Sequence, residues 1–100
     1  MIKDYELMMI FSPKLSAEKA DAANEAALTI LREAGAEIIK TDAWGKRMLA
    51  YPIDKHLEAY YYVNYMKMDS LAVKAIKQQF NINENVIRHM FVARDELRSH

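Results

Sequence analysis

The 100-residue sequence has no cysteine and only two glycines and two prolines. Without cysteine the chain can form neither disulfides nor thiolate metal sites, which fits a reducing compartment. Two isolated glycines cannot make a glycine-rich loop that cradles a phosphate group. No apolar run reaches the roughly 20 residues that span a bilayer, and the N-terminal segment is too short and too acidic for a secretory signal. We therefore expect a cytoplasmic protein without membrane segments.

An excess of charge is also missing, since 14 basic and 14 acidic side chains give a net charge of zero. This balance argues against a broad basic surface that binds nucleic acid indiscriminately. A local basic patch stays open, because salt screens charges only beyond about 10 Å. With 52% hydrophobic and 28% charged residues, the composition is typical of a globular protein. The length predicts one domain over residues 1–94, followed by a short charged tail over residues 95–100.

The hydrophobic pattern predicts four strands and two helices. Strong strand patterns cover residues 5–11, 36–51, 58–68 and 86–93. Apolar residues at helical spacing indicate one helix between Ser16 and Gly35 and a second helix that Asp69 and Ser70 cap. The order βαββαβ is that of the split βαβ, or ferredoxin-like, fold of the α+β class. Because each βαβ half has a right-handed crossover, both helices should cover one face of a four-stranded antiparallel sheet.

The second predicted strand breaks its own alternation. Ile38 and Trp44 share one parity, whereas Leu49 and Tyr51 have the other. One extra residue at Gly45 would bring all four side chains to one face, and glycine often occupies such a bulge.

The bulge would also change the direction of the residues that follow it. Lys46 and Arg47 would then point outward, toward solvent or a ligand. Pro52 would end the strand, because proline removes a donor from the hydrogen-bond ladder.

The sheet face without helices is expected to be unusually apolar. A sheet with one wet face should alternate between apolar and polar residues, so a second apolar face indicates that something covers it. The alternative is a scatter of tolerated apolar side chains, which is common on protein surfaces. The first strand has Met8 and Ile10 opposite its core residues, and the last strand has Val86, Met90 and Val92 on one face and Ile87 and Phe91 on the other.

The sequence offers no arrangement for catalysis or metal binding. His56, His89 and His100 are far apart, and none stands in a metal-ligand spacing. No nucleophile can be matched with a base. We therefore expect a protein that is not an enzyme and needs no cofactor, metal or small-molecule substrate.

Nucleic-acid binding fits the predicted fold better. RNA-recognition domains share this topology and stack bases on aromatic residues of the first and third strands. The segment YYYVNYMK invites this comparison, but the pattern of basic residue, glycine and alternating aromatics that defines that module is absent. We interpret the tyrosines as core and interface residues. The better candidates for RNA contacts are the cations Lys46, Arg47, Arg88 and Arg94, whose alternative role is merely to face solvent.

The segment DAWGKRMLAYPIDK resembles the signature of a bacterial family, small-subunit ribosomal protein six. In that family an aromatic or apolar residue, glycine and basic residues precede Leu-Ala-Tyr-Pro-Ile. The likeness covers nearly the whole chain, including Tyr5-Glu6 after a basic residue, the Gly35-Ala36 junction and NENVIRHMFV; only Met48 departs from the signature. The motif residues here are Trp44, Gly45, Leu49, Ala50, Tyr51, Pro52 and Ile53.

The resemblance implies a structural constituent of the small subunit of the cytoplasmic ribosome. Family members bind the central domain of small-subunit (16S) ribosomal RNA together with a basic protein, small-subunit ribosomal protein eighteen. We expect partner contacts from Met8 and Met90, with the acidic Glu6 and Asp42 steering the approach. The alternative is a ferredoxin-like regulatory or protein-interaction module without an RNA role. The expected contacts with RNA phosphates are Lys3, Lys46, Arg47, Lys55, Arg88 and Arg94.

Overall fold

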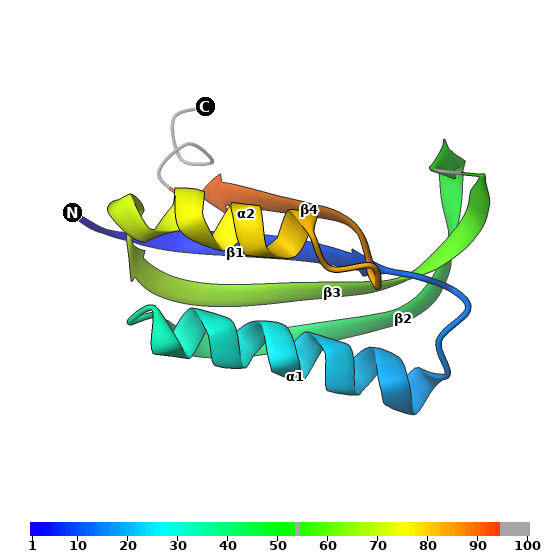
Figure 1. The fold of residues 1–100 in the computed structure, drawn as a ribbon, viewed down its shortest axis with the longest axis horizontal. Coiled ribbons are helices and arrows are strands. Elements are labelled where there is room, and N and C mark those ends of the chain that lie inside the picture. Colours follow the sequence, from blue (N-terminus) through cyan, green and yellow to red (C-terminus); the bar gives the residue numbers. More distant parts are fainter. Residues whose placement is uncertain (54, 95–100) are drawn as a thin grey trace.

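The computed structural model describes residues 1–53 and 55–94, and the tail predicted over residues 95–100 lies outside them. The described strands form an antiparallel sheet in the order β2-β3-β1-β4. Figure 1 shows both helices on the same face of this sheet, which confirms the predicted ferredoxin-like fold. In the described residues, no helix is long and apolar enough to cross a membrane. The elements are β1 (Ile2–Phe11), α1 (Ala17–Glu33), β2 (Glu37–Ile53), β3 (His56–Asp69), a 3-10 turn (Ser70–Ala72), α2 (Val73–Asn81) and β4 (Val86–Ala93).

Local sequence signals set both ends of α1. The Ser16 hydroxyl accepts a hydrogen bond from the backbone N–H of Lys19 at 3.2 Å, as an N-cap residue does. At the other end Gly35 has a φ of +94°, a conformation that glycine adopts readily. The N–H of Ala36 then donates to the carbonyl of Leu31 at 2.9 Å. These bonds close the helix and lead the chain into β2.

β2 does not end where proline was expected to end it. The strand continues through Pro52 to Ile53. Its register with β3 is irregular between the Met48–Glu58 and Ile53–His56 pairs, and Pro52 lies in this interval. A residue without an N–H is tolerated where the ladder is already interrupted. The prediction that Pro52 terminates the strand is therefore wrong.

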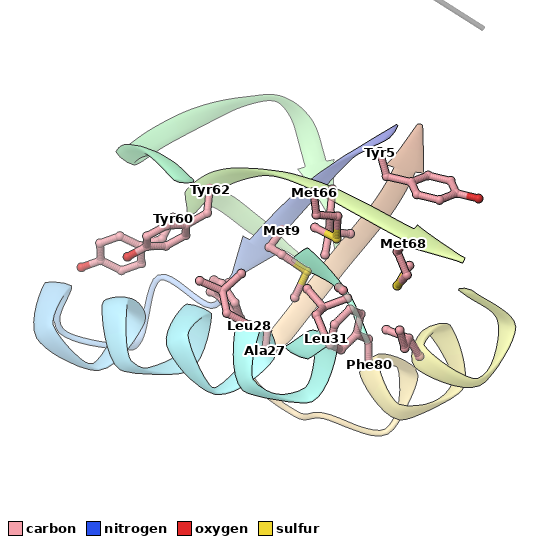
Figure 2. Close-up of a cluster of buried hydrophobic side chains, with 14 of the residues drawn as sticks. Tyr5, Met9, Ala27, Leu28, Leu31, Tyr60, Tyr62, Met66, Met68 and Phe80 are labelled. Carbon is pink, nitrogen blue, oxygen red and sulfur yellow. The ribbon is translucent and has the colours of Figure 1, made fainter. Parts of the chain in front are cut away.

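The hydrophobic core lies between the sheet and the two helices (Figure 2). Leu7, Met9 and Phe11 of β1 are fully buried at alternate positions, because successive side chains of a strand point to opposite faces. This packing uses one face of the sheet and leaves the opposite face without helices. The core also includes Tyr60, Tyr62, Met66 and Met68 from β3, Leu28 and Leu31 from α1, and Ile76 and Phe80 from α2.

Polar hydrogen bonds cross this core between α1 and the sheet. Asn24 of α1 and Asn64 of β3 are 3% and 0% exposed, and they exchange two amide hydrogen bonds of 3.1 and 3.0 Å. The hydroxyl of Thr41 in β2 donates a further bond to the side-chain oxygen Oδ1 of Asn64 at 2.8 Å. Tyr62 donates its hydroxyl proton to Asp21, and burial together with this carboxylate raises the pKa of Tyr62. The bonds link α1 to β3 and, through Asn64, to β2.

Candidate functional site

The sheet face without helices carries apolar side chains across its centre, as the sequence predicted. Met8 of β1 lies between Val63 of β3 and Met90 of β4. Val63 is 5% exposed, whereas 49% of Met90 remains exposed. These three residues line a groove of about 140 Å³ together with Glu6, Trp44, Tyr65 and Val92. A groove with this apolar lining, open to solvent, is the best candidate for an interface.

The β2–β3 hairpin extends this apolar surface. Its end bends out of the plane of the sheet (Figure 1). Leu49, Tyr51 and Ile53 of the hairpin line a second groove, of about 180 Å³, with Ile10 and Arg88. Ile10 is only 4% exposed, although it lies on the helix-free side. Met8 and Met90 line both grooves, so the apolar surface is continuous from the centre of the sheet to the hairpin.

The bulge expected at Gly45 is present, but its effect differs from the prediction. The register shifts between Ala43 and Gly45, so Trp44 is the extra residue. Ile38 packs against the core, whereas Trp44, Leu49 and Tyr51 line the grooves on the helix-free side, so the bulge does not bring all four side chains to one face. That part of the interpretation is wrong. Instead the bulge places Trp44 against Tyr61, with the two rings stacked at 6.3 Å.

Replacing Gly45 with valine should destabilise the protein through its backbone alone. Gly45 has a φ of +77°, and a Cβ atom built there would meet no heavy atom within 4 Å. The expected loss in the free energy of unfolding is about 1–3 kcal/mol, the usual cost of holding a non-glycine residue in this conformation. Urea unfolding measures it. Ala43→Val, at an exposed position of the same strand, is the control; an equal loss in both variants would contradict a special role for Gly45.

Lys46 and Arg47 lie on opposite faces of β2, because side chains alternate along a strand. Lys46 lies opposite Tyr60, with its Nζ 5.2 Å from the ring centroid and 3.9 Å from Oε1 of Glu58. Arg47 lies over the Trp44 ring at 5.6 Å and donates from Nε to the Trp44 carbonyl at 3.1 Å. The expectation from the sequence was that both cations point outward together. The structure corrects this, since each contacts an aromatic ring on its own side.

The other cations predicted to contact RNA are spread over the molecule. Arg88 lines the second groove on the helix-free face. The Nε of Arg94 lies 3.8 Å from Oε1 of Glu6. Lys3 lies near the start of β1, and Lys55 stands in the β2–β3 turn with a φ of +69°. The six predicted cations thus occupy several surfaces rather than a single basic patch.

The acidic residues expected to meet a partner are each paired with a cation of the same chain. Glu6 pairs with Arg94, and a carboxylate oxygen of Asp42 lies 3.6 Å from the Nζ of Lys40. Lys40 was not singled out from the sequence. Lys40 and Asp42 are two residues apart and therefore lie on the same face of β2, so the alternation of the strand could have predicted this pair.

β4 departs from the expected alternation at its first residue. Val86 was expected beside Met90 and Val92, but it packs against the core. The register between β1 and β4 shifts near this point, which turns Val86 to the helix side. His89 of β4 is hydrogen-bonded: its Nε2 lies 2.9 Å from Oδ1 of Asn81, and burial lowers its pKa. Among the described residues, no group of three or more histidine, aspartate or glutamate side chains could hold a metal ion.

Comparison with known proteins agrees with the signature in the sequence. The family model of Ribosomal protein S6 matches residues 4–93. The small ribosomal subunit proteins bS6 of Desulforamulus reducens and Carboxydothermus hydrogenoformans are 36% and 34% identical to this chain, over 95% and 96% of its length and 100% of their own. The crystal structure of 30S ribosomal protein S6 from Thermotoga maritima is similar with a TM-score of 0.90 and 26% identity, covering 98% of this chain and 92% of that one.

The fold, the apolar face and these relatives define a structural protein of the small ribosomal subunit rather than an enzyme. The chain belongs to the ribosomal protein S6 family. It is therefore an RNA-binding component of the cytoplasmic ribosome, acts in translation, and associates with small-subunit ribosomal RNA and ribosomal proteins. Membership of this family sets aside the alternative of a regulatory module without an RNA role.

Proposed function

We propose that the chain binds the central domain of small-subunit (16S) ribosomal RNA together with small-subunit ribosomal protein eighteen. The apolar helix-free face carries this proposal, with Met8 beside the half-exposed Met90 and acidic residues at its border. A protein of zero net charge can bind a basic protein through such a face, while its cations bind RNA.

Exposed apolar and aromatic side chains support the protein half of this proposal. Trp44, Met90 and Tyr51 are 45%, 49% and 61% exposed and belong to the two connected grooves. Methionine and aromatic residues are enriched in protein–protein interfaces, where they fill pockets that exclude water. Glu6 lines the first groove, and Asp42 lies opposite Val63, which also lines it; both carboxylates complement the charge of a basic partner.

Cations of the β2–β3 hairpin support the RNA half. Lys46, Arg47 and Lys55 belong to this hairpin, whose strand β2 is an edge of the sheet. Contacts between such cations and phosphates supply affinity without reading the bases. Because Lys46 and Arg47 lie on opposite faces, an RNA backbone that contacts both must follow the free edge of β2.

Alanine variants of Lys46 and Arg47 should therefore weaken RNA binding separately. Each single variant removes one phosphate contact and should reduce the slope of log affinity against log salt concentration by about 0.9, and the double variant by about the sum. Titration of a central-domain RNA fragment at several salt concentrations measures the slope. Arg32→Ala, an exposed cation of α1, is the control. If both single variants keep the slope and affinity of the parent, these residues do not contact RNA.

Reconstitution tests the proposed function as a whole. The purified chain, small-subunit ribosomal protein eighteen and a central-domain fragment of 16S RNA should co-migrate as one complex on a gel-filtration column. A fragment from another domain of the same RNA is the control and should not join the complex. A chain that elutes alone from the mixture with the central-domain fragment would refute the proposal.

A further inference from the structure

Charged side chains on the helix-free face gather around the ring of Tyr65. Lys40 of β2 and Glu6 of β1 lie opposite Tyr65 on its two sides. The Nζ of Lys40 and the guanidinium of Arg94 lie 4.8 and 5.9 Å from the ring centroid. Lys40 pairs with Asp42 at 3.6 Å, and Arg94 pairs with Glu6 at 3.8 Å. We call these five residues the Tyr65 cluster.

Both ion pairs of the Tyr65 cluster are exposed to water. The side chains of Lys40 and Asp42 are 60% and 41% exposed, and those of Arg94 and Glu6 are 45% and 28% exposed. Exposed pairs contribute little stability, because water screens the charges and the side chains lose freedom when they pair. A competing charge on a binding partner can therefore replace either member of a pair.

The cluster adjoins the groove that is proposed to bind the partner protein. Glu6 and Tyr65 line this groove with Met8. Asp42 lies opposite Val63, which also lines it. A partner that inserts an apolar side chain into the groove brings its neighbouring residues against these two carboxylates. Lysine or arginine at those neighbouring positions would complement them, so the site suits a basic protein.

We propose that the Tyr65 cluster exchanges its ion pairs during assembly and thereby couples partner binding to RNA binding. Cations of the basic partner displace Arg94 from Glu6 and Lys40 from Asp42. The released Arg94 and Lys40 then bind RNA phosphates. The inference rests on the proposed function, which supplies both ligands. Such coupling is reciprocal, so RNA that captures the two cations also frees the two carboxylates for the partner.

Variants that lack one member of each ion pair distinguish an exchange of ion pairs from simple contacts with the partner and the RNA. Lys40→Gln/Arg94→Gln frees both carboxylates, so it should bind purified small-subunit ribosomal protein eighteen about two- to fivefold more tightly than the parent, the range expected for exposed pairs. Glu6→Gln/Asp42→Asn frees both cations, so without the partner it should bind the central-domain RNA fragment more tightly by a similar factor. Calorimetry and filter binding measure the two affinities.

Charge-matched variants on α1 and before it control for the change in net charge. Lys14→Gln/Lys19→Gln removes two exposed cations, and Glu25→Gln/Glu33→Gln removes two exposed carboxylates, in both cases away from the Tyr65 cluster. Gains in the cluster variants no larger than in these controls would overturn the exchange, and intact binding by the parent would leave the proposed function standing. A parent that binds neither ligand would overturn the proposed function and the exchange with it.

Discussion

Replacing Met8 and Met90 with serine is expected to reduce the affinity for small-subunit ribosomal protein eighteen by at least about 100-fold, because two central apolar anchors would be removed. The two side chains are cross-strand neighbours and line both grooves of the helix-free face. Neither belongs to the core between the sheet and the helices. The melting temperature should therefore change little, since serine replaces side chains that are partly exposed in the free protein.

A matched control removes apolar area elsewhere on the surface. Leu71 and Ile82 are 85% and 83% exposed beside α2, and Leu71→Ser/Ile82→Ser should leave partner affinity unchanged. Calorimetric titration with the purified partner compares both double variants with the parent. If Met8→Ser/Met90→Ser lowers the melting temperature sharply without a specific loss of binding, the two methionines stabilise the fold and the covered-face proposal fails.

Replacing Asn64 alone with leucine should lower the free energy of unfolding by about 2–5 kcal/mol. Asn24 would then lose both of its reciprocal hydrogen bonds while staying 3% exposed. Each buried donor or acceptor that is left without a partner lowers the free energy of unfolding by about 1–3 kcal/mol. The Thr41 hydroxyl would also lose its acceptor. This is a large fraction of the roughly 5–15 kcal/mol that is typical of a folded domain. Urea unfolding gives the difference.

A double variant tests whether the two amides act as a pair. Asn24→Leu/Asn64→Leu removes both buried polar groups and should recover at least half of the loss, because no unpaired amide remains. Thr41→Val, which removes only the third hydrogen bond, should cost about 1 kcal/mol. Losses that simply add in the double variant would show that Asn24 and Asn64 are not energetically coupled.

Features set by neighbouring residues were predictable from the sequence. The start of α1 after Ser16, its end before Gly35 and the range of β4 were all confirmed. The bulge at Gly45 was also confirmed as a register shift, although it does not bring the four apolar side chains to one face. Each depends on backbone conformation or hydrogen bonds within a few residues, which sequence patterns report directly.

Features set by distant residues were not predictable. Asn24 and Asn64 are 40 residues apart, and nothing beside either residue indicates the other. The exposure of Trp44 and Tyr51 depends on β2 being an edge strand whose end extends past the core. Alternation predicts that two faces exist, but what packs against each face is decided by other elements.

The sequence by itself determined the order of the elements, the ferredoxin-like arrangement and the family, because periodicity, caps and the signature segment DAWGKRMLAYPIDK are local properties of the chain. The tertiary structure alone decided that Met8 and Met90 meet on the face without helices, and that Lys46 and Arg47 separate to opposite sides. It also decided that Glu6 and Asp42 are already paired, with Arg94 and Lys40. The reason is physical: burial and charge pairing depend on which strands become neighbours, and strand neighbours are fixed only when the whole sheet forms.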